Sequence, residues 1–317
     1  MNMSFSWLYD APSGVFKNHQ MSSKLRMAAI AECKFMQFVQ PEEGYGKGKG
    51  ESITISRVSN IAVPTSAVLS EGVEIPQDEI VLSTIAITVQ ELGRAVPYTS
   101  LANDLAKFDI QNVIQKKLRD QMALVLDGLA ADAFQAGKVK AIPTGVAALT
   151  MDTDGTASTA ATVNLNAYHI SQIRDYMFST LNIPTYEGGD YMCLASTKAL
   201  RGLKSDPDWE VWHKYTDPKA KYNSEVGKFE GIRFIEVNNT ASLSGSLGTG
   251  SVLGEAIFFG DDAVAMAVAQ DPELRADQPK DFGRSKNVAW YGVLAFKQTW
   301  SDSASAGESK VVHVTSA

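Results

Sequence analysis

Residues 106–136 read AKFDIQNVIQKKLRDQMALVLDGLAADAFQA, the most regular periodic pattern in the chain. Apolar residues recur there at spacings of three and four, the period of one face of an α-helix. Gly128 costs about 1 kcal/mol relative to alanine but does not end so regular a pattern. The stretch predicts a rod of about 46 Å, which a compact small enzyme seldom needs, although a core helix of a mixed fold would look the same over its central turns. The periodic residues are Phe108, Val113, Ile114, Leu118, Met122, Val125, Leu126, Leu129, Ala133 and Phe134.

Two runs upstream of this stretch alternate apolar and polar residues, as a strand with one apolar face does. Ile53 and Ile55 form the first run, and Ile85, Ile87 and Val89 form the second. The connection at 62–77 is bounded by prolines and suits an irregular link better than a tight turn. A two-stranded ribbon is marginally stable in water, and its unpaired edges invite another chain. The runs predict a projecting ribbon that needs a partner surface, unless both strands belong to a sheet formed with other strands of the chain.

The remaining patterns predict a helix, a mixed lobe and a group of C-terminal strands. Residues 20–40 have amphipathic spacing and predict a helix that Pro41 ends. The roughly one hundred residues after the long periodic stretch predict a separate α/β lobe, from a helix capped by Asn164, strands at 191–194 and 231–237, and a helix at 196–203. Four later apolar runs should pack against the long helix, because neither partner can bury its apolar face alone. These runs are 256–259, 265–268, 288–300 and 311–314.

The composition is that of an ordinary soluble globular protein, with 317 residues, 44% hydrophobic and 21% charged. A formal net charge of −7 argues against a broad basic face for nucleic acid. We expect no signal peptide and no membrane helix, since no apolar stretch reaches the roughly 18 residues required. Cys33 and Cys193 stand far apart without a CxxC or histidine pairing, which argues against a disulfide framework or zinc site and fits a reducing cytosol.

Residues suited to catalysis are scarce and scattered. The glycine-rich stretch 46–50 lacks the spacing of a phosphate loop and leads into a strand. Asp152 and Asp154 lack the remaining ligands of a calcium loop, so a polar turn is the better interpretation. The sequence predicts no catalytic residue, no cofactor and no metal ligand, although a triad assembled from distant residues stays open. The four histidines, for which we expect surface or core positions, are His19, His169, His213 and His313.

The order of these elements, together with local sequence at several places, resembles one protein family. The chain resembles the major capsid protein of tailed bacteriophages with the HK97-like fold, and more narrowly the branch found in N4-like phages. None of the local motifs is chemically diagnostic alone, and their order carries the resemblance. They are FMQF at 35–38, LSEGV at 69–73, QMALVLD at 121–127, SEVGKFEGIRF at 224–234 and AIFFGDDA at 256–263.

The resemblance implies an α+β fold with an N-terminal arm at 1–42 and an extended β-hairpin loop at 43–98. It further implies a peripheral domain formed by 99–140 with 251–317, containing the long spine helix, and an α/β axial domain at 141–250. Many copies would assemble as pentamers and hexamers of an icosahedral shell around double-stranded DNA, held non-specifically. Scaffolding, portal and cement proteins are further implied partners, with no membrane. The protein would belong to the virion capsid and assemble in the host cytoplasm.

In this family the extended loop lies over a neighbouring subunit, and we expect intersubunit contacts from the alternating residues Ile53, Ile55, Ile85, Ile87 and Val89. Some members cross-link their shells through a loop lysine, but residues 51–100 contain none, so no such cross-link is expected. Residues 1–50 carry six basic and four acidic residues, whereas 51–100 carry two and six. Attraction between arm and loop of different subunits would then add orientation and assembly rate.

Two other classes of function stay open from the sequence. A soluble hydrolase would need a pocket joining a histidine to a nucleophile or a metal. A binding module, such as an adhesin or a chaperone, would have a discrete partner and would not assemble with itself.

Overall fold

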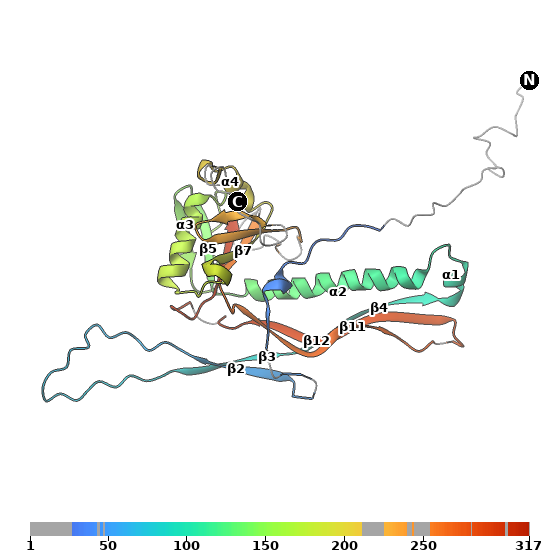
Figure 1. Ribbon diagram of the computed structural model, residues 1–317, viewed down its shortest axis with the longest axis horizontal. Coiled ribbons are helices and arrows are strands. Elements are labelled where there is room, and N and C mark those ends of the chain that lie inside the picture. Colours follow the sequence, from blue (N-terminus) through green and yellow to red (C-terminus); the bar gives the residue numbers. More distant parts are fainter. Residues whose placement is uncertain are drawn as a thin grey trace, which may run out of the picture.

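The computed structural model describes residues 27–42, 45–46, 48–210, 225–239, 243, 254–279, 281–301 and 304–316. The molecule is elongated. A lobe stands at one end of a long helix, a sheet runs along the helix, and a two-stranded ribbon projects past the lobe (Figure 1). Within these described ranges, no helix is long and apolar enough to cross a membrane.

The periodic stretch forms helix α2, Ile110–Gln135, preceded by the short helix α1, Ser100–Leu105. α2 begins where Oδ1 of Asp109 accepts hydrogen bonds from the backbone N–H groups of Gln111 and Asn112, at 3.0 and 3.3 Å. Its 26 residues make a rod of about 39 Å. The expected long helix is confirmed over 110–135, including its internal glycine, whereas 106–109 of the expected range precede it.

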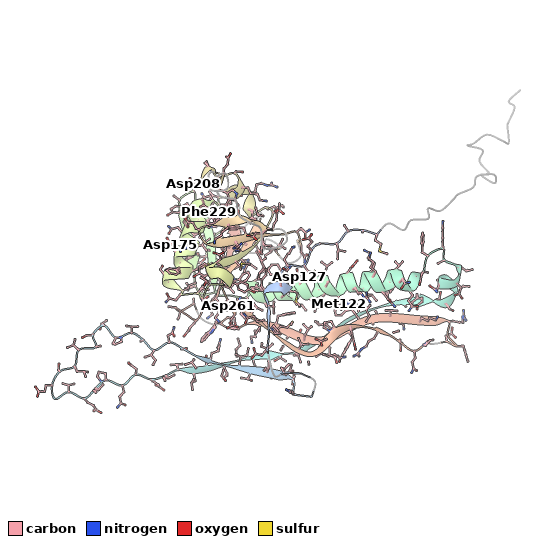
Figure 2. All side chains as sticks on the ribbon, viewed as in Figure 1. Met122, Asp127, Asp175, Asp208, Phe229 and Asp261 are labelled. Atoms are coloured by element: carbon pink, nitrogen blue, oxygen red, sulfur yellow. The ribbon has the colours of Figure 1, made fainter. Side chains whose placement is uncertain are left out.

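One face of α2 packs against a four-stranded sheet of order β1-β11-β12-β4, in which β12 is antiparallel to both neighbours. Leu118 of α2 is buried with Val288 and Trp290 of β12, and Met122 lies beside them (Figure 2). The alternation pattern does not predict β4, whose residues up to Tyr98 fall in the range expected for the extended loop. The strands are β1 Gln40–Pro41, β4 Gln90–Thr99, β11 Val264–Ala276 and β12 Ser285–Gln298.

The lobe contains a seven-stranded sheet of order β6-β5-β13-β10-β7-β9-β8. Helices α3, Ala167–Asp175, and α4, Leu200–Lys204, cover one face, and the C-terminal end of α2 packs against the other. The strands are β5 Val139–Gly145, β6 Ala148–Asp152, β7 Tyr191–Ser196, β8 Glu225–Phe229, β9 Ile232–Val237, β10 Gly254–Phe259 and β13 Val311–Ser316.

Two of the four C-terminal runs belong to the sheet of the lobe and not to the sheet that runs along α2. The runs at 256–259 and 311–314 become β10 and β13, which pair with each other inside the lobe. Every residue of both strands is buried, because strands flank them on both sides and both faces of the sheet are covered. Phe259 and Val311 still share a hydrophobic cluster with the end of α2. The runs at 265–268 and 288–300 lie along α2 as expected.

The helix expected over 20–40 is wrong where the structure describes it. Residues 20–26 lie outside the described residues, 27–34 have no regular structure, and only a 3-10 turn at Phe35–Phe38 follows. The two phenylalanines are buried against Phe134 and Phe259. Their spacing therefore reflects tertiary contacts rather than a helix.

Two boundaries in the lobe also differ from expectation. α3 is capped by Asn166 rather than Asn164, since the Asn166 side chain accepts a hydrogen bond from the backbone N–H of His169 at 3.1 Å. The helix expected at 196–203 is shorter, because Ser196 belongs to β7 and 197–199 form a turn, so α4 begins at Leu200.

Three ionisable side chains are buried together where the lobe meets the end of α2. Nζ of Lys140 donates to the carbonyl of Gln135, the last residue of α2, at 2.7 Å, and lies 3.3 Å from Nδ1 of His313. Nε2 of His313 lies 3.3 Å from Oε2 of Glu255. Burial lowers the pKa of Lys140 to about 8 and also lowers the pKa of His313, against the raising effect of Glu255. Protonation of His313 therefore opposes folding of this junction.

We expect stability to fall as the pH falls below about 6.5, the ordinary pKa of histidine, because the unfolded chain then binds a proton that folded His313 does not. His313→Gln keeps an acceptor for Lys140 and a donor for Glu255 but cannot titrate. Circular dichroism should show a smaller drop in melting temperature between about pH 7.5 and pH 5.5 for the variant. His169, whose pKa burial also lowers, titrates in both proteins. Equal drops would mean that His313 is not responsible.

Candidate assembly surface

The ribbon is a two-stranded antiparallel sheet of β2, Ser52–Val58, and β3, Leu82–Thr88. Ile53 pairs with Ile87, and Ile55 pairs with Ile85. The two strands expected from the alternation are confirmed. Residues 59–81 connect them without helix or strand, as the prolines in this link indicate.

The apolar face of the ribbon lies against the body of the same chain. Ile87, at 1% exposed, forms a cluster with Ala265 and Ala267 of β11, and Ile53, Ile55 and Val89 pack against it half-buried. Ile85 is 7% exposed. The alternation thus identifies the apolar face correctly and brings four of the five predicted contact residues into one cluster. Contact of these five residues with a neighbouring subunit stays a prediction.

The tip of the ribbon exposes its apolar side chains to water, whereas the base of the ribbon buries its own. Val63 is 92% exposed and Val68 is 87% exposed. Side chains of this segment stand away from the body (Figure 2). Sequence reasoning missed the tip because its apolar residues follow no period, although the density of such residues over 58–82 was a usable signal. The exposed residues are Val58, Ile61, Val63, Val68, Leu69, Val73, Ile75, Ile80, Val81 and Leu82.

The tip is also acidic. Residues 58–82 include Glu71, Glu74, Asp78 and Glu79, and contain neither lysine nor arginine. All four acidic residues are exposed. A contiguous exposed apolar segment with charge of one sign is typical of an interaction surface.

Contacts at the base hold the ribbon to the body. Arg57 is buried, and its Nη1 donates to the carbonyl of Thr299 at 3.1 Å while its guanidinium lies 4.7 Å from the ring centre of Trp300. Nδ2 of Asn60 donates to the carbonyl of Ala306 at 3.3 Å. Nζ of Lys297 donates to the carbonyl of Ala86 at 2.9 Å. Among the described residues of the ribbon, 61–81 make no such hydrogen bond to the body.

The arm is held by a buried carboxylate on α2. Oδ1 of Asp127 accepts hydrogen bonds from the backbone N–H groups of Phe35 and Met36, at 2.8 and 3.4 Å (Figure 2). Burial raises the pKa of Asp127, and these hydrogen bonds reduce the rise. Residues of β1 then pair in parallel with β11, so the arm passes from α2 to the sheet beside the ribbon.

The described histidines have structural partners. His169 accepts at Nδ1 from the backbone N–H of Asn166, 3.3 Å away, and its Nε2 lies 2.8 Å from the carbonyl of Gly145. His313 belongs to the buried cluster with Lys140 and Glu255. His19 and His213 lie outside the described residues. Among residues that the structure describes, no three histidine, cysteine or carboxylate side chains are grouped to hold a metal ion.

No protein-family model matches the chain, and no curated protein matches it. Solved structures do match over its whole length. The capsid of Ralstonia phage GP4 matches with a TM-score of 0.70 and 15% identity, covering 99% of this chain and 98% of that chain. The capsid of Helicobacter pylori bacteriophage KHP30 matches with a TM-score of 0.67 and 12% identity, covering 100% and 99%. The cyanophage Pam1 capsid matches with a TM-score of 0.67 and 15% identity, covering 95% and 97%.

These matches confirm the expected fold class. The chain has the α+β, HK97-like fold of phage capsid proteins, and the matches cover nearly the whole of both chains. The narrower resemblance to N4-like phages stays a prediction.

Arg57→Met should lower the free energy of unfolding by about 2 kcal/mol, because it removes a charged hydrogen bond and a cation–π contact at a buried site. Urea denaturation measures the change. Arg94→Met is the matched control, since Arg94 is the other basic residue of the 51–100 range and is exposed on β4. An unchanged unfolding midpoint for the Arg57 variant would contradict this account of the ribbon's attachment.

Proposed function

We propose that this chain is a structural major capsid protein, and that it assembles into pentamers and hexamers of an icosahedral phage head enclosing double-stranded DNA. The observation that carries the proposal is the end-to-end match to phage capsid structures, at a TM-score of 0.70 with 99% and 98% coverage. A soluble hydrolase or a binding module is not favoured, since neither explains the projecting ribbon.

The exposed tip supports self-assembly on physical grounds. Its apolar side chains lose contact with water only when another surface covers them, and a second copy provides such a surface at every position of a shell. Each protomer would donate its tip to one neighbour and receive a tip from another. This arrangement is head-to-tail, and it closes into rings when the rotation between copies allows it.

The domain division expected from the family is part of this proposal. The arm would comprise 1–42, the extended loop 43–98, the peripheral domain 99–140 with 251–317, and the axial domain 141–250. β4 pairs with β12, and β10 and β13 complete the sheet of the lobe. Extending the peripheral domain to β4, and the axial domain to β10 and β13, would therefore place these three strands in the domain that holds most of their sheet.

Partners and location follow from the proposed role. The protein would form part of the virion after assembly in the host cytoplasm, with scaffolding, portal and cement proteins as further partners. A net charge of −7 supports loose, non-specific contact with the packaged DNA, since each neutralised phosphate would add salt-dependent affinity. Lysine is absent from 51–100, which supports a shell held by noncovalent burial.

The test of the proposal is self-assembly of the purified protein. Negative-stain microscopy should show capsomers or closed particles of uniform diameter. Val63→Asp with Val68→Asp should reduce particle yield at least about tenfold, because charge on an apolar contact must be desolvated. Ser66→Asp with Ser70→Asp is the matched control, which adds the same charge to the same segment without removing apolar side chains.

Melting temperature should be unchanged in both double variants, because these side chains are exposed in the single chain. A wild-type protein that stays monomeric at high concentration across salt and pH would contradict the proposal.

Assembly should also slow as salt rises. Residues 1–50 have a positive balance and residues 51–100 a negative one, so attraction between arm and loop of different copies would speed their encounter. Light scattering should show slower assembly at about 500 mM than at about 50 mM sodium chloride, because the screening length falls severalfold. Glu71→Gln with Glu74→Gln should weaken this dependence. Assembly rates that do not change with salt would refute the electrostatic contribution.

A further inference from the structure

A fully exposed phenylalanine stands at the end of the molecule opposite to the ribbon tip. Phe282 lies in the connection between β11 and β12, and its side chain is 107% exposed. The side chain therefore packs against nothing in the part of the chain that the structure describes. Figure 1 shows this connection beside α1, at the end of α2 that is remote from the lobe.

The backbone of Phe282 is strained. Its φ is 52° and that of Gly283 is 91°, and the backbone N–H of Arg284 donates to the carbonyl of Asp281 at 3.0 Å. Left-handed φ at both central residues is typical of a type I′ turn, in which Asn-Gly is a favoured pair. A bulky residue in this conformation is an outlier with a free-energy cost. Since asparagine would relieve that cost, the stability of the single chain does not explain a phenylalanine here.

Helix α1 adds apolar side chains at the same end of the molecule. Leu101 is 65% exposed and Leu105 is 78% exposed, and their spacing of four places them on one face of α1. The helix begins beside the turn, because the backbone N–H of Ser100 donates to the carbonyl of Arg284 at 2.9 Å. We call Phe282, Leu101 and Leu105 the distal patch.

The charges around the distal patch favour contact with its own copy. Arg284 and Asp281, whose side chains are 80% and 59% exposed, form an ion pair at 3.5 Å beside Phe282. Residues 100–109 and 277–286 together carry four acidic and four basic residues, whereas the ribbon tip carries acidic residues alone. Two ribbon tips would repel each other. Two distal patches would not, and an aspartate of one copy could pair with an arginine of the next.

A shell also needs a second kind of contact. The head-to-tail contact of the ribbon produces rings or open filaments, so that contact alone does not join one ring to another. The distal patch shares no residue with the ribbon tip and lies at the other end of the molecule (Figure 1). It is therefore available for contact between copies whose ribbons are already engaged.

We propose that the distal patch binds the distal patch of other copies about a rotation axis, and that Phe282 is retained in its strained turn because this contact buries it. The inference rests on the proposed capsid function. It adds a like-to-like interface to the head-to-tail interface of the ribbon.

Phe282→Asn tests the proposal, because it relieves the backbone strain and removes the aromatic contact. The unassembled variant should have a higher melting temperature than wild type. Negative-stain microscopy should show at least about tenfold fewer closed particles while rings persist, since a central aromatic residue dominates the energy of such a contact. A residue with only a structural role would not raise stability and lower assembly together. Phe282→Trp keeps both the strain and the aromatic contact, and should match wild type in both measurements.

A cross-linking experiment tests whether the patch meets its own copy. Leu101→Cys places a thiol in the distal patch, and a bismaleimide reagent should then join assembled protomers to each other. Ser66→Cys is the matched control, because the head-to-tail contact does not bring two ribbon tips together. Wild type gives the background from Cys33 and Cys193, the first partly exposed and the second buried.

Four outcomes would overturn the proposal. Normal particle yield for Phe282→Asn, or no cross-linked protomers for Leu101→Cys in assembled particles, would remove the contact and leave the proposed capsid function standing. A melting temperature of Phe282→Asn that does not rise would remove the argument from strain. Loss of rings together with particles would assign Phe282 to the contact within a ring. A wild type that forms neither rings nor particles would instead contradict the capsid function itself, and the like-to-like contact with it.

Discussion

Helix α2 packs against two different sheets along its length, and the position of every other part depends on that packing. Leu118 in its N-terminal half is buried against β12 of the four-stranded sheet, while Ala130 and Phe134 in its last turns fill one face of the lobe's sheet. The ring of Phe134 lies 4.9 Å from that of Phe259 in the lobe and 5.8 Å from that of Phe35 in the arm. One aromatic cluster thus joins helix, lobe and arm.

This architecture leaves apolar surface that a single chain cannot cover. α2 buries the side chains that face the four-stranded sheet, and the ribbon contacts the body at its base. Apolar area removed from water contributes roughly 25 cal/mol per Å². Burying the ten exposed apolar side chains at the ribbon tip would therefore release a large free energy that the single chain does not gain. The proposed assembly would recover it, which would explain why a chain of ordinary composition takes an extended shape.

The parts of the fold that the sequence predicts are those with a local period. The three- and four-residue spacing in α2 and the alternation in β2 and β3 arise because one face of each element is buried. β4 has no such signal. Gly93 is required there because a Cβ would come within 2.8 Å of the carbonyl of Trp290, a contact that exists only in the folded sheet. Pro97 is tolerated because β4 is an edge strand.

The candidate surface was predicted only in part for the same reason. The alternating isoleucines mark the ribbon's buried base, whereas the exposed tip has no period to mark it. That separation has a consequence for assembly. Arg57 and Asn60 fix the base to the segment that follows β12, so the tip is carried in a set direction before any partner arrives. Association costs less when the contacting segment is already ordered. In the proposed assembly, a buried, charged anchor at the base would therefore raise the affinity of an apolar contact at the tip, although the two share no residue.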